Sequence, residues 1–558
     1  MSAVAPAKPA AGTYGADHRG SIIMPGVVQG LTPGLQTRVE GLWCACCCPK
    51  PALYNKDMAA LMYNGPGRLL QLTTFLFLSY ALLYYAELEA GCLDDDAVDM
   101  AYNRTLSLTP TAAPSMIPTV EQEPLCEERV YGMRPSSIVP NISVFNGVVI
   151  TLTIPFVGAM VDYSPWRRSL GYYSAAVLVF TNFLQIFVSA ETWFLICIVQ
   201  VPCFMAYYSH LLCVYAYIPE LTDDEDEMAA VMGPAKAIET ISTLIFFGLI
   251  AVSGATICPS SEEDFYGKAV CEARVAQTLS CIVGVGFFYQ SWKLFSERPA
   301  VQSLPGGETV EGKSLTKASS MLCGQAFRQI WGTLCELQTD FPMTARFLIA
   351  YAFWESASNA ILTLSTTYIR LVLKIDSIVV IGAILLVTNI IGALLTGKFG
   401  PKLGMRRVIM GCLLADCLVC VLLMSMLRGP DDQMWAYVLM LPLGLVMGSM
   451  YTAQRAHYAV FIPGGREAEL MGFYMFAGQV ISWAPMLVFS VINEATNDMS
   501  LAFPILVVFY IIAAVIFSTV DHQKNHECIE PTLNRRVRAS RRYAGGGASD
   551  GAAGGGIG

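Results

Sequence analysis

Few ionisable side chains interrupt the long apolar runs of this 558-residue sequence, and one of them has polar neighbours at helical spacing. Ser358 and Asn359 follow Glu355 by three and four positions, so a helix would place all three on one face. An ionisable group at membrane depth costs about 2.5–3.5 kcal/mol on insertion scales, so it needs a partner, a cavity or a function. Glu355 could bind an ammonium group, carry a proton or make a structural hydrogen bond between helices.

A second candidate is Arg455, which has Gln454 and His457 beside it and Tyr451 one turn away. A guanidinium in this position could hold a carboxylate through two parallel hydrogen bonds. It also stands near the end of its apolar run, where a long side chain can reach the membrane surface. A substrate site and a gate or surface role therefore both stay open.

The sequence contains no Gly-x-x-x-x-Gly-Lys-Ser/Thr loop, so ATP is not an evident energy source. Histidine and cysteine spacing gives no metal site, and no nucleophile, base and orienting group come together in a motif. We therefore expect no enzyme and no cofactor, and transport that is passive or coupled to an ion gradient.

These residues must be positioned by membrane-spanning helices. The sequence is 54% hydrophobic and 14% charged, whereas an ordinary soluble domain has about a quarter charged residues. Its apolar runs are about 20 residues long, which suits a helix that crosses a bilayer. The expected spans are 68–90, 139–161, 170–190, 193–217, 231–256, 274–295, 344–370, 376–397, 408–427, 435–460, 470–492 and 501–520.

Charge placement predicts the orientation of these twelve spans. Basic residues gather in the loop 162–168, in the loop 398–407 and in the tail after the last span, so this side and both termini should be cytoplasmic. The opposite side has an acidic loop with a glycosylation sequon at Asn103. That side should be oxidising, and the expected disulfide pairs there are Cys92 with Cys126 and Cys258 with Cys271.

The expected organisation has five parts. They are a disordered cytoplasmic tail with a cysteine cluster (1–65), a six-helix half (66–295), a cytoplasmic linker (296–342), a second six-helix half (343–520) and a basic, then glycine-rich, disordered cytoplasmic tail (521–558).

The two halves repeat each other. The loop that ends in Arg167 and Arg168 matches the loop that ends in Arg406 and Arg407. The same alignment pairs Tyr207 with Tyr451 and His210 with Gln454, which predicts similar cavity walls. His210 could relay protons, although a histidine in a helix is more often a packed hydrogen-bonding residue.

The Gly and Arg-Arg loops resemble the signature of the major facilitator superfamily. The resemblance implies an all-α membrane protein with twelve helices in two pseudo-symmetric halves. It also implies that Asp162 and the four arginines Arg167, Arg168, Arg406 and Arg407 are gate residues that pair with neighbouring helix ends. The second loop departs from the signature, since Pro401 stands where Asp162 would align.

Longer stretches resemble the autophagy-related vacuole-effluxer branch of that superfamily. They include Ile154-Pro-Phe-Val-Gly-Ala-Met-Val-Asp162, Phe347-Leu-Ile-Ala-Tyr-Ala-Phe-Trp-Glu355-Ser, Ile462-Pro-Gly-Gly-Arg-Glu-Ala-Glu469 and Ser482-Trp-Ala-Pro485. The resemblance implies export of small polar solutes, amino acids foremost, from the vacuole lumen, with protons as the candidate coupling ion. We expect a vacuolar membrane location, with the plasma membrane as the alternative, and no nucleic-acid partner. A non-transporting receptor or scaffold with this fold is the competing hypothesis.

Overall fold

The computed structural model describes residues 56–92, 126–218, 221, 225–258, 265–300, 315–375, 378–459, 461 and 467–521. The sequon at Asn103, the cysteine cluster of the first tail and the glycine-rich end lie outside these residues. Within them, the regular structure is helical apart from one isolated bridge between Val130 and Met133. The predicted all-α class is confirmed.

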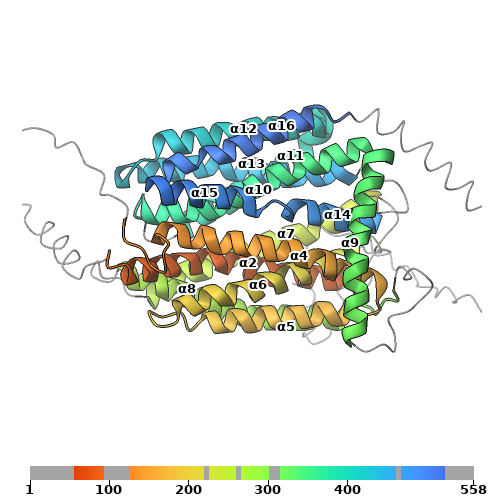
Figure 1. The fold of residues 1–558 in the computed structure, drawn as a ribbon, viewed down its shortest axis with the longest axis horizontal. Helices are drawn as coiled ribbons and strands as arrows, with labels where there is room; N and C mark the ends of the chain where they lie inside the picture. Colours follow the sequence, from red (N-terminus) through yellow and green to blue (C-terminus); the bar gives the residue numbers. More distant parts are fainter. Residues whose placement is uncertain are drawn as a thin grey trace, which may run out of the picture.

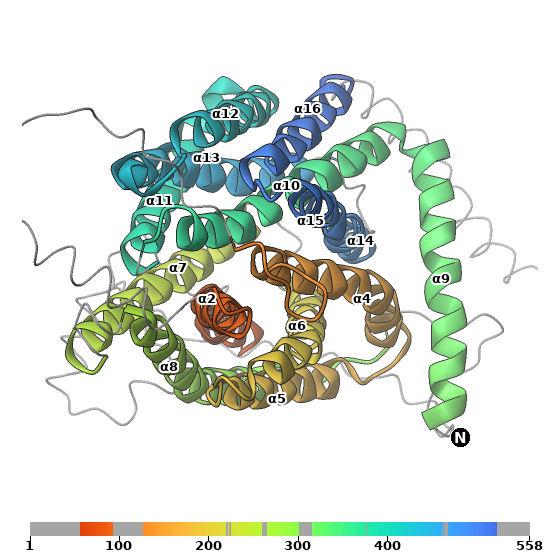
Figure 2. The ribbon, with the colours of Figure 1, turned by 60° about the vertical axis from the view of Figure 1, so that its left-hand side comes forward.

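Two bundles of helices lie side by side (Figures 1 and 2). The first contains α2 (Lys56–Glu89), α4 (Pro135–Tyr163), α5 (Arg167–Gln185), α6 (Trp193–Tyr215), α7 (Glu225–Thr256) and α8 (Phe265–Leu294). The second contains α10 (Pro342–Leu371), α11 (Val379–Leu403), α12 (Met405–Met426), α13 (Gln433–Ala459), α14 (Glu467–Gln479), α15 (Trp483–Thr496) and α16 (Pro504–Ser518). Two short 3₁₀ turns, η4 (Pro430–Asp432) and η5 (Ser500–Ala502), precede α13 and α16.

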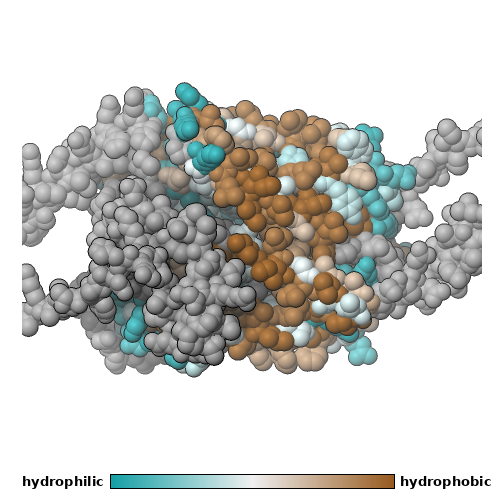
Figure 3. All heavy atoms as spheres, turned by 180° about the vertical axis from the view of Figure 1, so that it is seen from behind, coloured by the Kyte–Doolittle hydropathy of each residue, from teal (hydrophilic) through white to brown (hydrophobic). Residues whose placement is uncertain are grey.

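The outer surface of the bundles is apolar. Large side chains such as Leu195, Leu414 and Val515 are about 60% exposed (59%, 61% and 62%), and apolar residues form a broad band across the middle of the molecule (Figure 3). Ten helical stretches of the described chain are long and apolar enough to cross a membrane, with α14 and α15 forming one of them. The protein is therefore a multi-pass membrane protein. Two more helices of the first bundle, α2 and α5, run alongside its other helices (Figure 1).

The first helix begins earlier than the sequence suggested. We expected residues 1–65 to be disordered, but α2 starts at Lys56. Its first turns are held by buried Met58 and Leu61, and by Asp57, which accepts a hydrogen bond from Arg298 (2.9 Å). Burial of these apolar side chains explains the extension, which the Gly-Pro-Gly stretch at 65–67 obscured.

The linker between the halves contains a helix that we did not predict. Helix α9 (Leu315–Asp340) runs across the ends of the bundles instead of along them (Figures 1 and 2). Leu322 is buried against Ala159 and Tyr163 near the end of α4, and Gln325 donates a hydrogen bond to the Tyr163 hydroxyl (3.2 Å). We call the end of the molecule at which α9 lies the linker end.

The opposite end has two disulfides, Cys92–Cys126 and Cys258–Cys271, and we call it the disulfide end. Both cysteine pairs are the ones proposed from the sequence.

The expected span 470–492 is not one continuous helix, because α14 ends at Gln479 and α15 begins at Trp483. The break lies where the two halves meet closely, since a Cβ added at Gly147 of α4 would lie 2.9 Å from Trp483 Cβ. The carbonyl of Gln479, the last residue of α14, accepts hydrogen bonds from the Ser482 backbone N–H (3.1 Å) and from the Thr151 hydroxyl of α4 (3.1 Å). The broken segment and a neighbouring helix together bond a backbone carbonyl that lipid could not.

Candidate functional site

A carboxylate and an amide from facing helices form the first part of the site. Gln454 Nε2 of α13 donates to Glu355 Oε2 of α10 at 3.4 Å. The other end of the same amide accepts a hydrogen bond from Trp354 Nε1 (2.8 Å), and Trp354 is fully buried. Because the indole can only donate, it fixes which end of the Gln454 amide faces Glu355.

Arg455 lies near the carboxyl-terminal end of α13, and its side chain is exposed. Its electrostatic neighbours come from several helices of both halves, namely Tyr215, Tyr351, Tyr474 and Glu239, and it also interacts with Glu355. A guanidinium with electrostatic neighbours in both halves lies between the halves and not toward lipid, and its exposure means that water reaches it. These neighbours favour a binding role for Arg455 over a role at the lipid surface.

Tyrosines from four helices, α6, α10, α13 and α14, surround Glu355 and Arg455. Tyr351 stacks on Tyr474 with ring centroids 4.0 Å apart, and Tyr474 stacks on Tyr458 at 4.8 Å. Tyr451 and Tyr208 both interact electrostatically with Glu355. Tyr451 of this group was a candidate from the sequence. The i, i+4 spacing of Tyr351 and Glu355 was the available signal for a second one.

The amino-terminal half contributes a buried ion pair that the sequence analysis missed. Arg68 Nη2 of α2 lies 2.9 Å from Glu239 Oε2 of α7, and both side chains are less than one-tenth exposed. The guanidinium also lies over the Tyr215 ring, 5.2 Å from its centroid. Arg68 stood at the predicted edge of its span, where a basic residue needs no explanation. The early start of α2 places it inside the bundle.

His210 is fully buried and packed in the amino-terminal half. Its Nε2 lies 3.0 Å from Asn64 Nδ2 and its Nδ1 lies 3.4 Å from the Gly171 carbonyl, while Phe288 packs against the ring. This environment favours a structural role over a proton relay. Tyr207, one turn earlier, lies near the site, because it interacts electrostatically with Arg68.

Two other candidates are engaged in packing within the carboxyl-terminal half. His457 packs among aromatic rings, including Phe461 at 5.0 Å. Ser358 shares a hydrogen bond with the Tyr510 hydroxyl of α16 (3.1 Å). Asn359 is partly buried. Of the polar face expected from Glu355 to Asn359, Ser358 therefore belongs to the packing of α10 against α16.

The predicted gate arginines contact helix ends of their own half. Arg167 donates to the carbonyl of Ala216 after α6 (3.3 Å), and Arg168 donates to the carbonyl of Trp292 near the end of α8 (3.2 Å). Arg406 donates to the carbonyl of Ser518 at the end of α16 (2.7 Å). These cations lie where the negative ends of the helix dipoles favour them. Asp162 lies in the last turn of α4 and Arg407 in the first turn of α12, so the gate role stays a prediction for all five.

Polar contacts join the two halves at the disulfide end. Glu494 of α15 accepts a hydrogen bond from the Arg134 backbone (2.8 Å) and lies 3.5 Å from the Arg129 guanidinium. Asn493 Nδ2 donates to Ser136 Oγ and Ser137 Oγ at 2.7 and 2.9 Å. The halves are thus closed on each other at this end.

Comparison with known proteins agrees with this architecture. Residues 133–528 match the family described as vacuole effluxer Atg22 like. The chain belongs to this family. Among curated members of the Atg22-like family, autophagy-related protein 22 of Cryptococcus neoformans is 22% identical over 269 residues, which are 45% of this chain and 46% of that protein. The protein of the same name from Botryotinia fuckeliana is 25% identical over 266 residues, 43% of this chain and 44% of that protein.

The chain thus spans about half the length of the curated Atg22 relatives that it matches. Two solved structures show the fold. The human organic anion transporter MFSD10 has a TM-score of 0.52 at 12% identity, over 83% of this chain and 99% of the other. The xylose transporter XylE from E. coli, in an inward open conformation, has a TM-score of 0.51 at 11% identity, over 83% and 96%. The predicted major facilitator fold is confirmed, and these relatives and structural neighbours are transporters, not enzymes.

Proposed function

We propose that this protein is a secondary transporter of small zwitterionic solutes, amino acids foremost, that works by alternating access. The observation that supports this most directly is that the Glu355 carboxyl group of α10 and the Arg455 guanidinium of α13 interact electrostatically among tyrosines of both halves. A zwitterion offers the opposite charge to each group.

Each group has a distinct task in this proposal. Arg455 binds the solute carboxylate through paired N–H donors, because its guanidinium is planar and always charged. Glu355 takes the solute ammonium group or the coupled proton, and Gln454 orients it. The surrounding tyrosine hydroxyls supply neutral hydrogen bonds that tolerate either protonation state of Glu355.

The contacts at the disulfide end support a state that opens toward the linker end. Rocking of one half against the other would break the Glu494 and Asn493 contacts and would open the disulfide end instead of the linker end. If the linker end is cytoplasmic, as the basic loops predict, the structure represents the state that releases solute into the cytosol. Export of amino acids from the vacuole rests on this orientation and on the family.

The experiment is solute efflux from liposomes that contain the purified protein, with a panel of radiolabelled amino acids and an imposed pH gradient. We expect Arg455→Gln to reduce efflux about 10- to 100-fold, because a hydrogen bond to a charged group contributes about 1.5–3 kcal/mol. Arg455→Lys should recover only part of the loss, since it keeps the charge without the paired donors.

The Glu355→Gln variant separates the two roles of the carboxyl group. If Glu355 carries the proton, this variant loses gradient-driven efflux but keeps exchange of labelled for unlabelled solute. If it binds the ammonium group, both activities fall. Glu191→Gln and Arg346→Gln are matched controls at exposed positions. Wild-type efflux in both Arg455→Gln and Glu355→Gln would contradict the proposed site, and no efflux of any amino acid would contradict the solute class.

A further inference from the structure

A group of buried amide side chains lies in the amino-terminal half, apart from the charged site. Asn182 and Gln185 project from α5, Gln200 from α6 and Gln277 from α8, and each is at most 1% exposed. Four buried amides in the membrane-spanning part of one bundle are unusual, because polar groups there are expected to be matched by partners.

The amides satisfy each other only in part. Gln277 Nε2 donates to Gln185 Oε1 (2.9 Å), and the Cys203 thiol donates to Asn182 Oδ1 (3.6 Å). Among the residues that the structure describes, Gln185 Nε2, Gln200 Nε2 and Gln277 Oε1 have no hydrogen-bond partner, apart from the weak interaction of the Gln185 side chain with the Cys203 sulfur. Two donors and one acceptor are thus left buried, and such groups cost free energy unless something binds them.

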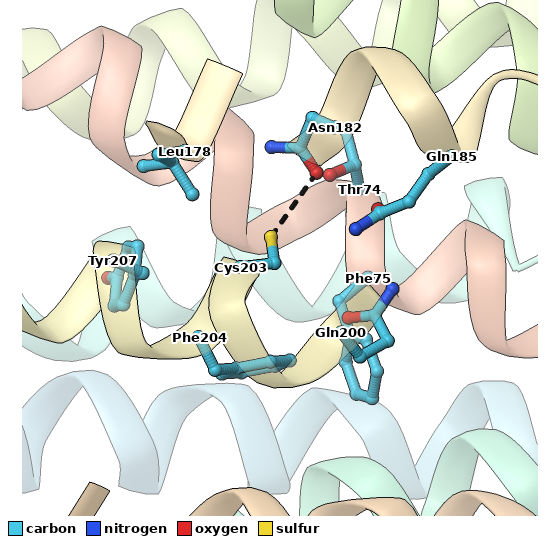
Figure 4. Close-up of a pocket in the computed structure, with 9 residues that line it drawn as sticks. All are labelled: Thr74, Phe75, Leu178, Asn182, Gln185, Gln200, Cys203, Phe204 and Tyr207. Atoms are coloured by element: carbon cyan, nitrogen blue, oxygen red, sulfur yellow. Dashed lines mark hydrogen bonds between the residues drawn. The ribbon is translucent and has the colours of Figure 1, made fainter. Parts of the chain in front are cut away.

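Asn182, Gln185 and Gln200 line a pocket between α2, α5 and α6 (Figure 4). Its volume of about 10 Å³ is close to the space that one water molecule needs. The side chains of Gln185 and Gln200 point into it, beside Cys203 and Thr74. The remaining walls are apolar or aromatic, from Phe75, Leu178, Phe204 and Tyr207. A polar lining of this kind can hold ordered water, whereas an apolar cavity stays dry.

The lining defines the chemistry of the occupant. No acidic or basic side chain lines the pocket, so a charged group there would lack a counter-charge. The unpaired amide atoms of the lining, Gln185 Nε2 and Gln200 Nε2, are donors, so the complementary group must accept hydrogen bonds. We propose that the pocket binds a neutral group of this type, either water or the carboxamide or hydroxyl of a transported solute.

An aromatic wall connects the pocket to the central site. Phe75 and Phe204 pack edge to face, with centroids 5.0 Å apart. Phe204 and Phe476 of α14 in the other half pack against one apolar cluster, which contains Ile154 and Leu212. Tyr207 lines the pocket and interacts electrostatically with Arg68. A solute side chain would enter by displacing these rings, and this second source of the occupant rests on the proposed function.

The test compares Gln185→Met and Gln200→Met with wild type by two measurements on the full chain. The first is thermal melting of the purified protein. The second is the ratio of glutamine to methionine efflux, because these two solutes have similar size and differ in the carboxamide. Gln433→Met is the control, since its amide bonds the Leu373 carbonyl at the disulfide end, away from the pocket.

A solute carboxamide in the pocket predicts that each variant lowers the glutamine-to-methionine ratio about 2- to 10-fold, the value of one neutral hydrogen bond, without raising the melting temperature. Water alone predicts an unchanged ratio and a melting temperature that stays equal or falls, because the bound water is lost with the amide. Both outcomes support the site and distinguish its occupants.

A rise in melting temperature in both variants with no change in the ratio would overturn the proposal, because it would show that the amides are unsatisfied in a dry pocket. The melting result stands even if no amino acid is transported. Failure of the pocket and failure of the proposed function are therefore distinguishable.

Discussion

The two halves of the protein hold their buried charges in different ways. In the amino-terminal half, Arg68 and Glu239 contact each other directly at 2.9 Å, and water is nearly excluded from both. In the carboxyl-terminal half, Glu355 makes only a 3.4 Å hydrogen bond to the Gln454 amide, and Arg455 is exposed to the internal space. The amino-terminal half thus pairs these two charges with each other, whereas the carboxyl-terminal half leaves its charges accessible to water and to a solute.

This difference distinguishes a structural ion pair from a pair of charges that can bind a solute. A buried ion pair repays its own desolvation and has little capacity left for a ligand, whereas charges on a wet cavity wall can exchange water for solute. We therefore infer that the Arg68–Glu239 pair holds α2 against α7, and that solute binding belongs to Glu355 and Arg455.

The largest expected effect comes from breaking the Arg68–Glu239 pair. Arg68→Met leaves Glu239 buried without its cation, which should cost about 3–5 kcal/mol of stability. The double variant Arg68→Met/Glu239→Leu should recover most of that loss, because an apolar pair of similar size needs no desolvation. Thermal melting of the purified protein in detergent measures both.

The matched variant in the other half is Arg455→Met, whose melting temperature should stay close to that of wild type, since water solvates the groups it leaves behind. Equal destabilisation by Arg68→Met and Arg455→Met would contradict the distinction between a buried structural ion pair and solvent-accessible binding charges.

A smaller effect is expected at Gln454, whose amide contacts both the buried Trp354 indole and the Glu355 carboxyl group. Gln454→Leu removes the acceptor of Trp354 Nε1, and a buried donor without a partner costs about 1–3 kcal/mol. It also frees Glu355, so efflux should fall as well. Adding Trp354→Phe removes the orphaned donor, so the double variant should recover stability but not efflux. Recovery of both would show that Gln454 acts on packing alone.

The sequence predicted the features that depend on hydrophobic pattern and on single costly residues. Long apolar runs gave the positions of the helices, and Glu355 and Arg455 were identifiable because a charge within such a run needs a reason. The cysteine pairs followed from their positions beside the same loops.

Features that depend on contacts between helices could not be predicted in this way. Tyr215 and Tyr474 are compatible with any membrane helix, and only packing shows that they surround Arg455. Arg68 was hidden at the predicted edge of a span. The break before Trp483 depends on the close approach of Gly147 from the other half, which no local pattern encodes.

The smallest expected effect lies at the disulfide end, where charges of the two halves meet near solvent. Glu494 is 23% exposed and Arg129 53% exposed, so Glu494→Gln should weaken the closure by at most about 1 kcal/mol, roughly a fivefold change in the balance of states. Hydrogen exchange of residues 129–137 should rise accordingly, with Glu191→Gln as an exposed control on the same side. If Glu494→Gln instead slows efflux as strongly as Glu355→Gln, the contact takes part in the transport cycle beyond closing one end. The difference between charges paired for structure and charges that take part in transport would then distinguish the two ends of the molecule as well as its two halves.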